Sequence, residues 1–553
     1  MTDSLCISIA QLDPTVGDIA ANLGRLRDVW REAKAAHADL VVASELFVAG
    51  YPPEDLVLKP AFQKDAMEAV EAFAKDTEDG GPAVLIGTPW VKEGALYNAV
   101  AFLDAGAVQG VTFKADLPNY GVFDEKRLFR SGPMPGPLNV RGVRIGVPIC
   151  EDIWGYDPVE CLSETGAEML LVPNGSPFDA AKRDHRLNVA LARIIDSGLP
   201  LAYLNQVGGQ DELVFDGASF VLNADRRLAV QLPSWEEALV VTQWRRGNAG
   251  WMCEPGPIAE AEELNAALYS AMMLGLKDYV SKNRFPGVVI GLSGGIDSAL
   301  TAAVAVDALG RERVRCVMMP SRFTSRESLN DAAEVARLLG ITYDTVDIEE
   351  PVRAFGGILA PVFAGRSPDA TEENIQARTR GLILMAISNK FGPMVLTTGN
   401  KSEMSVGYAT LYGDMAGGYS VLKDLYKTQV FALSRWRNQT HPKGALGPDG
   451  RVMPENVITR PPTAELRENQ KDEDSLPPYA VLDGILECLI EGEMSFDEVV
   501  AKGYDPATVK RVEHMIYVAE YKRRQAPPGV KLSIRNFGRD RRYPITNAYR
   551  DAR

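Results

Sequence analysis

The 553-residue sequence has few of the residues that build metal centres and disulfide frameworks. It contains six cysteines, none of them in a Cys-x-x-Cys pair, and only four histidines. This pattern lacks the usual zinc-ligand spacings and gives no reason to expect disulfide bonds. Free, scattered cysteines are typical of a reducing compartment, so we expect a cytoplasmic protein.

Long apolar runs and an excess of positive charge are missing as well. No apolar run reaches the length of a membrane span, and the first residues, MTDS, lack the basic and apolar regions of a signal peptide. The formal net charge of −15 argues against a partner that needs a broad basic face. We therefore expect neither a membrane nor a nucleic-acid partner.

What the chain does contain is an alternation of apolar strands and amphipathic helices, which is typical of α/β proteins. In the first half we predict strands at 6–10, 40–43, 83–86, 99–103, 143–149, 170–172, 201–204 and 219–222, with helices at 22–36 and 61–75. In the second half we predict strands at 288–290, 314–319, 343–347 and 394–397, with helices at 259–282, 299–308, 328–339 and 375–390. The second series indicates a doubly wound parallel sheet.

Two segments rich in Gly and Pro interrupt this alternation. RRGNAGWMCEPGP at 245–257 predicts a linker at 246–258 that separates a domain at 1–245 from a domain at 259–553. The segment 438–462 lacks periodicity and indicates an exposed loop with the character of a mobile lid.

An anion site is predicted where the sequence VVIGLSGGIDS runs from Val288 to Ser298. An apolar strand leads into a glycine turn and then into a helix N-terminus, whose free N–H groups and dipole favour phosphate. The motif is not the common nucleotide loop, because it lacks Gly-x-x-x-x-Gly-Lys-Ser/Thr. It resembles the pyrophosphate-binding loop of the N-type ATP pyrophosphatases, which split ATP between the α and β phosphates. That resemblance implies that Asp297 is a Mg²⁺ ligand.

In the first half, Glu45, Lys114 and Cys150 stand at or near the ends of apolar strands. A thiol attacks carbonyls best as a thiolate, and a neighbouring carboxylate can take its proton. A lysine ammonium and a backbone N–H can then stabilise the oxyanion. His37 and His185 belong to no cysteine-protease motif, which disfavours a Cys–His mechanism.

The three residues and their surroundings, SELFVAGYPPEDL, FKADLPNYGVFDEKRLF and PICEDIW, resemble the nitrilase superfamily of carbon–nitrogen amidases over about residues 4–245. The resemblance implies an α-β-β-α sandwich that hydrolyses an amide through a thioester. Glu45 would be the general base, Lys114 the oxyanion-side cation, Cys150 the nucleophile and Glu125 a second, positioning carboxylate. It implies a set of contacts to glutamine: Tyr51, Tyr120, Ser176 and Lys182.

In the second half, polar clusters follow predicted strands around the anion loop. Splitting ATP at the α-phosphate needs a metal that bridges phosphates and cations that spread their charge. Asp297 and Glu403 offer the metal oxygens. Three further side chains offer the cations, namely Arg322, Lys401 and Lys427.

The stretches ENIQARTR, TTGNKSE, GYATLYGD and KDLYKTQVF, together with SGGIDS, resemble the NAD synthetases over about residues 260–535. The resemblance implies ATP and pyrophosphate contacts at Ser293, Gly294, Gly295, Ile296, Asp297, Ser298, Arg378, Thr398 and Lys427. It implies contacts to a dinucleotide substrate at Asn374, Tyr408, Asp414 and Lys522. Asp297 and Glu403 would bind Mg²⁺. The shorter NAD synthetases, which use only free ammonia, carry acidic and histidine residues in the stretch that corresponds to 399–402. This chain has Gly-Asn-Lys-Ser there and so matches the longer type.

An amidase fused to an adenylating synthetase resembles the glutamine-dependent NAD synthetases. That resemblance implies ATP, glutamine and nicotinate adenine dinucleotide as substrates, Mg²⁺ as cofactor, an ammonia tunnel and a homo-oligomer. Other ATP pyrophosphatases amidate nucleotides or aspartate or adenylate tRNA bases, so a different acceptor is one alternative. A regulatory protein with inactive sites is another, but the presence of Glu45, Lys114, Cys150 and Asp297 argues against it.

Overall fold

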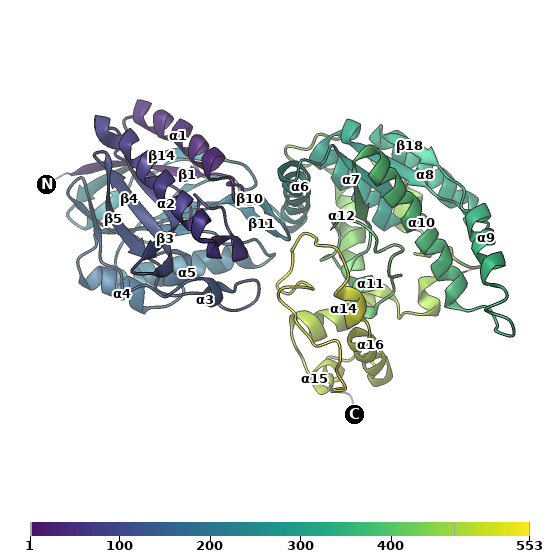
Figure 1. The fold of residues 1–553 in the computed structure, drawn as a ribbon. Helices are drawn as coiled ribbons and strands as arrows, with labels where there is room; N and C mark the ends of the chain where they lie inside the picture. Colours follow the sequence, from purple (N-terminus) through teal and green to yellow (C-terminus); the bar gives the residue numbers. More distant parts are fainter. Residues whose placement is uncertain (1–2, 469, 552–553) are drawn as a thin grey trace. The chain divides into compact units, whose positions relative to one another are not determined.

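The computed structural model describes residues 3–468 and 470–551 (Figure 1). The chain divides into two compact units, Met1–Glu262 and Glu263–Arg553. Among the described residues, no helix has the length and apolar character needed to cross a membrane.

The first unit contains two sheets with helices on their outer faces. One sheet has the order β15-β14-β1-β2-β3-β4-β5, formed by β1 (Ser4–Gln11), β2 (Leu40–Val42), β3 (Ala83–Lys92), β4 (Ala95–Asp104), β5 (Ala107–Phe113), β14 (Ala238–Gly247) and β15 (Gly250–Cys253). The other has the order β13-β12-β9-β8-β7-β6, formed by β6 (Leu138–Val140), β7 (Val143–Gly146), β8 (Met169–Asn174), β9 (Leu201–Asn205), β12 (Phe220–Leu222) and β13 (Leu228–Gln231). A separate hairpin joins β10 (Val207–Gln210) to β11 (Leu213–Asp216).

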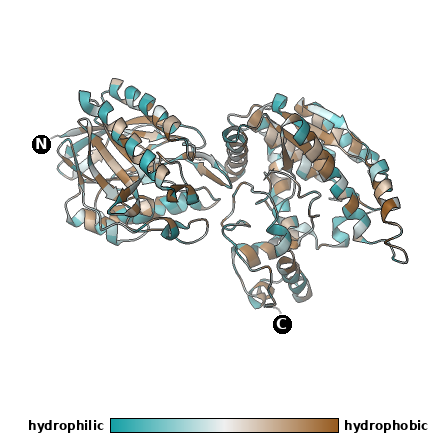
Figure 2. Cartoon of the chain, in the orientation of Figure 1, coloured by the Kyte–Doolittle hydropathy of each residue, from teal (hydrophilic) through white to brown (hydrophobic). Residues whose placement is uncertain are grey.

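Alternation along the strands explains the layers. On β1, Leu5, Ile7 and Ile9 point into the apolar core between the two sheets. Their neighbours Cys6 and Ala10 face a second core, which α1 (Ile19–Ala35) and α2 (Pro60–Ala74) cover. The helices α4 (Asp157–Glu164) and α5 (Lys182–Ser197) cover the other sheet in the same way. The strands are accordingly brown, and so hydrophobic, in Figure 2. The predicted α-β-β-α sandwich is confirmed.

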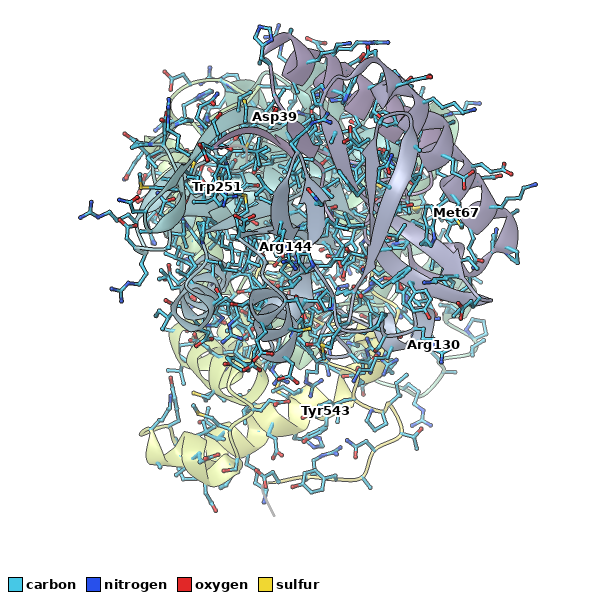
Figure 3. All side chains as sticks on the ribbon, turned by 90° about the vertical axis from the view of Figure 1, so that its left-hand side faces the viewer. Asp39, Met67, Arg130, Arg144, Trp251 and Tyr543 are labelled. Carbon is cyan, nitrogen blue, oxygen red and sulfur yellow. The ribbon has the colours of Figure 1, made fainter. Side chains whose placement is uncertain are left out.

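The linker prediction for 246–258 is wrong. β14 and β15 pair antiparallel across a tight turn, with Trp244 opposite Cys253, and so extend the larger sheet. Trp251, labelled in Figure 3, is only 3% exposed and belongs to the core between the sheets. The Gly and Asn residues that suggested a linker form the hairpin turn instead, and the boundary between the units follows Glu262.

The second unit is built on a parallel sheet of order β18-β17-β16-β19-β20. Its strands are β16 (Val288–Gly291), β17 (Val314–Met318), β18 (Thr342–Thr345), β19 (Met394–Thr397) and β20 (Tyr419–Ser420). The strand order reverses between β16 and β19, which is where a doubly wound sheet opens a crevice at its carboxyl edge. The predicted doubly wound architecture is confirmed.

Helices cover both faces of this sheet. α9 (Glu349–Leu359) and α10 (Ala370–Phe391) pack on Val289, Val317 and Val395. α7 (Ile296–Leu309) and α8 (Arg326–Leu339) connect neighbouring parallel strands and cover the opposite face, with α6 (Leu264–Lys282) and α12 (Lys427–Gln439) packed on α7.

A group of helices follows the sheet in the chain, and the sequence pattern did not predict it. Its helices are α14 (Tyr479–Leu486), α15 (Phe496–Ala501), α16 (Pro506–Val518) and α17 (Glu520–Arg523). The first three of these helices share one apolar core with Met404 and Val406 of the short helix α11 (Lys401–Val406). This core therefore supports a helix that carries a predicted metal ligand, Glu403.

The segment 438–462 is only partly the exposed loop that we predicted. Val452 and Met453 are fully buried, and α13 (Glu455–Thr459) contributes two more buried side chains. Arg437, itself paired with the buried Asp307, donates hydrogen bonds to the carbonyls of the segment. Because the segment lacks periodicity, the role of a buried arginine in organising it could not be predicted.

Candidate functional sites

The first unit brings the predicted catalytic residues into one buried cluster. Glu45 follows β2, Lys114 follows β5, and Cys150 opens the 3₁₀ helix η3 (Cys150–Ile153) shortly after β7. The Nζ of Lys114 lies 2.7 Å from Oε1 of Glu45 and 2.9 Å from Oε2 of Glu125. All four side chains are buried, so these charges interact in a medium that screens them weakly.

The charges of this cluster fix its protonation. Burial alone would lower the pKa of Lys114, but the carboxylates of Glu125 and Glu45 raise it well above its usual value. Burial raises the pKa of the Cys150 thiol well above its usual range, and Glu45 adds to this while Lys114 opposes it. The resting site therefore holds a protonated lysine and a neutral thiol, and the thiol needs a base to react.

Three residues that support the cluster were not predicted from the sequence. Nδ2 of Asn98, on β4, donates to Oε1 of Glu45 at 2.8 Å and points toward Oε2 of Glu125 at 3.4 Å. The backbone N–H of Gly175 donates to Oε2 of Glu45 at 2.8 Å. Only glycine fits at position 87, because a Cβ added to Gly87 would lie 2.2 Å from the Ser44 carbonyl oxygen. Together they hold Glu45 in one orientation with its charge balanced by donors.

Two of the predicted glutamine contacts lie inside the cluster or behind it. Tyr51 is buried and donates from its hydroxyl to Oε1 of Glu125 at 2.9 Å, so in this structure it positions a carboxylate. Ser176 is also buried, and its Oγ accepts from Nε of Arg186 at 3.1 Å. Arg186 in turn binds both carboxylate oxygens of Asp216 and the Ser176 carbonyl, which fixes the loop after β8.

The other two predicted contacts lie nearer the surface, next to the nucleophile. Tyr120 is 51% exposed, and its hydroxyl donates to Oε1 of Glu151 at 3.0 Å. The ammonium of Lys182 lies 4.8 Å from the centre of the Trp154 ring. Burial lowers the pKa of Lys182, and the positive charge of Arg186 lowers it further. Glu151, which directly follows Cys150, was not among the predicted contacts.

In the second unit, the predicted phosphate loop connects β16 to α7. Gly294 has a φ of +83°, and an added Cβ would lie 2.3 Å from the Ser328 carbonyl oxygen, so only glycine fits. Ser298 Oγ lies 3.1 Å from Ser293 Oγ and donates to the Gly295 carbonyl at 2.9 Å. Hydrogen bonds of these serines therefore stabilise the loop, and the N-terminus of α7 faces the crevice at the carboxyl edge of the sheet.

The two predicted metal ligands converge beside this loop. Nζ of Lys427 lies 2.5 Å from Oδ2 of Asp297 and 3.3 Å from Oε1 of Glu403. Asn400 links the same carboxylates, because its Nδ2 donates to Asp297 at 2.8 Å and its Oδ1 caps the N–H of Glu403 at 3.0 Å. In the sequence, Asn400 stands within the TTGNKSE stretch, and its role becomes visible only in the structure.

This donor set fits a magnesium ion that is shared with a substrate. No group of three or more His, Cys, Asp or Glu side chains in the described part of the chain is placed to hold a metal by itself. Mg²⁺ is typically held by one or two carboxylates together with phosphate oxygens, which matches Asp297 and Glu403. Burial raises the pKa of Glu403 to about 8, although the neighbouring Lys427 ammonium opposes the shift.

Two adjoining cavities, of about 170 and 240 Å³, open at the carboxyl edge of the sheet. The smaller is lined by Asp297, Glu403, Tyr408 and Lys427. The larger has apolar walls from Val317, Met319 and Leu384. Predicted residues that line both cavities are Ser293, Gly295, Thr398 and Asp414, and those that line the smaller one alone include Gly294, Ile296 and Ser298.

Three predicted contacts of the second unit do not line these cavities. Arg378 is exposed and donates to the Leu411 carbonyl, whereas Arg380, two positions along α10, lines the larger cavity. Asn374 accepts a hydrogen bond from Thr410 at 2.9 Å. Lys522 donates to the carbonyls of Gly407 and Ala409, and so supports the turn that carries Tyr408. In this structure Arg380, rather than Arg378, reaches the larger cavity, and the ATP contact at Arg378 stays a prediction.

Two of the three predicted cations are also placed elsewhere. Lys401 is fully buried, where its ammonium binds the carboxylates of Asp424 and Glu491. Arg322 has an exposed side chain that lies over the Phe323 ring and lines neither cavity. Only Lys427 approaches the predicted metal ligands.

Comparison with known proteins matches a family model to each half of the chain. The family model of carbon-nitrogen hydrolase matches residues 6–271, and that of NAD synthase matches residues 268–526. The glutamine-dependent NAD(+) synthetase of Rhodobacter capsulatus is 56% identical over 551 residues, covering 100% of both chains.

Solved structures give the same result. The glutamine-dependent NAD+ synthetase from Acinetobacter baumannii, in complex with ADP, is 43% identical, with a TM-score of 0.79 over 99% of each chain. The enzyme of the same name from Cytophaga hutchinsonii is 24% identical and shares the fold, with a TM-score of 0.82 over 99% of this chain and 98% of that one. Similarity at this level over the full length shows that the chain belongs to the glutamine-dependent NAD(+) synthetase family.

Proposed function

We propose that the protein converts nicotinate adenine dinucleotide, ATP and glutamine to NAD, AMP, pyrophosphate and glutamate. The observation that carries this proposal is the presence of two complete sites in one chain. One site holds Glu45, Lys114 and Cys150, and the other holds Asp297 and Lys427 beside a phosphate loop. Family membership supports the choice of substrates.

The test is a product balance with the purified protein. Nicotinate adenine dinucleotide, ATP and glutamine should give NAD, AMP and glutamate in equal amounts. Aspartate or a nucleotide in place of the dinucleotide should give no amide product. Amidation of one of these acceptors without NAD formation would replace our proposal with the alternative that other ATP pyrophosphatases suggest.

In the first unit, Glu45 takes the proton of the Cys150 thiol as the sulfur attacks the glutamine amide carbon. Lys114 stabilises the oxyanion that forms, together with the backbone N–H that follows the cysteine. Glu45 then returns the proton to the amide nitrogen, and ammonia leaves. Water, deprotonated by Glu45, hydrolyses the thioester to glutamate and restores the thiol.

The α-substituents of glutamine are assigned to the exposed rim of this site. Glu151 carries a carboxylate beside Cys150 and suits an α-ammonium, while Lys182 suits an α-carboxylate. Tyr120 holds the Glu151 carboxylate through its hydroxyl. Tyr51 and Ser176 then act behind the substrate, where they hold Glu125 and the loop after β8.

We expect Glu151→Gln to raise the KM for glutamine about tenfold, the cost of losing roughly one charge-assisted contact. The kcat should change less, because Glu45 and Lys114 stay in place. Steady-state glutaminase assays at several glutamine concentrations measure both values. Glu160→Gln, which changes an exposed carboxylate on α4, is the matched control and should behave as wild type. An unchanged KM in Glu151→Gln would remove Glu151 from the binding site.

In the second unit, the nicotinate carboxylate attacks the α-phosphorus of ATP, pyrophosphate leaves, and ammonia displaces AMP from the resulting adenylate. The phosphate loop and Lys427, which line the same cavity, spread the charge of the leaving pyrophosphate. Asp297 and Glu403 would hold Mg²⁺, which supplies charge neutralisation on the phosphates. Asn400 keeps both carboxylates oriented toward that position.

The proposal includes two features that the sequence resemblance implies, an ammonia passage and a homo-oligomer, and a cytoplasmic location that the cysteine pattern indicates. Ammonia at neutral pH is mostly protonated and diffuses away, so an enclosed passage between the two reactions would conserve it. A homo-oligomer in the cytoplasm fits the family and the scattered, unpaired cysteines.

A further inference from the structure

Asp152 is a buried carboxylate beside the nucleophile that no step of the proposed mechanism uses. It lies two residues after Cys150 in η3, and its side chain is 0% exposed. Oδ1 accepts the backbone N–H groups of Ala115 at 3.0 Å and Asp116 at 2.8 Å. Oδ2 accepts the N–H of Ile149 at 2.9 Å. One carboxylate is thus surrounded by three backbone donors.

The three donors belong to the two segments that carry the catalytic groups. Ala115 and Asp116 directly follow Lys114, and Ile149 directly precedes Cys150. These segments leave strands of different sheets, because β5 is in the seven-stranded sheet and β7 is in the six-stranded sheet. The Asp152 carboxylate therefore ties the lysine-bearing segment to the cysteine-bearing segment through the backbone.

The bond to Ile149 also spans the nucleophile itself. Cys150 has a φ of +47°, a left-handed conformation that residues other than glycine rarely adopt. The bond from Ile149 to Asp152 closes the turn across Cys150 and holds this conformation. Such strain persists only where the surrounding structure enforces it, and the Asp152 carboxyl group does so by accepting three backbone N–H groups, although burial raises its pKa to about 7.

We propose that Asp152 is a positioning residue that fixes Lys114 relative to Cys150 and holds the nucleophile in its left-handed turn. This inference adds a residue role to the proposed glutaminase reaction, and it rests on that proposal only for the identity of the amide substrate. Asp152 touches no reacting atom. Its effect passes through the placement of the ammonium that lowers the pKa of the Cys150 thiol.

Two variants of the full-length protein test this role. Asp152→Asn keeps the shape but turns an N–H donor toward the Ile149 N–H, and Asp152→Ala removes all three bonds. We expect kcat for glutamine to fall about tenfold in Asp152→Asn, as for one lost charged contact, and about a hundredfold in Asp152→Ala, as for a misplaced catalytic group. The KM should change little, because Glu151 and Lys182 are untouched.

The deciding readout is the pH dependence of Cys150 alkylation by iodoacetamide, followed on the Cys150 peptide by mass spectrometry. A less well placed Lys114 lowers the thiol pKa less, so the midpoint in Asp152→Asn should move to higher pH. This measurement needs no amide substrate, so it succeeds or fails independently of the proposed function. Asp157→Asn, which changes an exposed carboxylate at the start of α4, should keep the wild-type midpoint and kcat.

A purely structural role gives a different result. Asp152→Asn would then show fewer alkylatable Cys150 sites, but each site would keep the wild-type midpoint and the wild-type kcat. That outcome overturns the proposal, even if Asp152→Ala fails to fold. A raised midpoint together with a lowered kcat per alkylatable site supports it.

Discussion

Cys150→Ala is expected to abolish glutamine-driven NAD formation and to leave ammonium-driven formation close to wild type. Without the sulfur no thioester forms, and loss of a covalent nucleophile costs more than about 10³-fold in rate. The phosphate loop, Asp297 and Lys427 belong to the other compact unit and are chemically unchanged. The measurement is NAD formed from nicotinate adenine dinucleotide and ATP with either nitrogen source.

Cys161→Ala is the matched control, because this cysteine lies on α4 outside the cluster and is only partly buried. It should retain both activities. Persistent glutamine-driven synthesis in Cys150→Ala would mean that another group is the nucleophile. Loss of ammonium-driven synthesis as well would mean that the substitution damages more than the first site.

Asp297→Asn, unlike Cys150→Ala, should stop NAD formation from both glutamine and ammonium. The amide keeps the shape and can still accept the Asn400 N–H, but it loses the charge that pairs with Lys427 and would bind Mg²⁺. Loss of several kcal/mol of charge stabilisation corresponds to more than about 10³-fold in rate. Alkylation of Cys150 should be unchanged, since the first cluster is intact.

Assays with glutamine and with ammonium, each over a range of Mg²⁺ concentrations, measure this effect. Glu312→Gln, which removes an exposed carboxylate paired with Arg311, serves as control and should match wild type. If Asp297→Asn kept its ammonium-driven rate at ordinary Mg²⁺ concentration, Asp297 would be neither a metal ligand nor a partner of the reacting phosphates.

The residues that could be predicted from the sequence are those that follow apolar strands. Glu45, Lys114, Cys150 and the loop up to Ser298 stand at strand ends, where polar side chains in an apolar context are conspicuous. In the second unit the parallel sheet then brings such positions to one edge, whereas in the first unit the strands that precede Lys114 and Cys150 belong to different sheets. The alternation of strands and helices was enough to predict an α/β protein with a doubly wound sheet in its second half, whereas the α-β-β-α sandwich followed from the family resemblance.

The residues that escaped prediction depend on tertiary contacts. Asn98 lies within β4 and looks like an ordinary strand residue until Glu45 and Glu125 meet its amide. Lys401 and Lys427 are equivalent as isolated charges, yet one is buried against Asp424 and only the other reaches Asp297. Local sequence carries no information on which carboxylate will be the partner.

Helical phase and turn chemistry account for two other differences between the predictions and the structure. Arg378 and Arg380 differ by two positions on α10, about 200° around the helix, so only one of them can face the cavity. Gly and Asn at 247–250 are equally typical of linkers and of tight hairpins, and only the pairing of β14 with β15 distinguishes the two.

The most direct test of the account is whether the two sites carry out one reaction. The enzyme would be supplied with glutamine labelled with ¹⁵N in its amide, nicotinate adenine dinucleotide and ATP, in the presence of excess unlabelled ammonium. Mass spectrometry of the product then reports the source of the nitrogen. We predict that NAD carries ¹⁵N well above the isotope ratio of the bulk ammonium. NAD labelled only at the bulk ratio would contradict the account, because ammonia from Cys150 would then reach the second site only through solution.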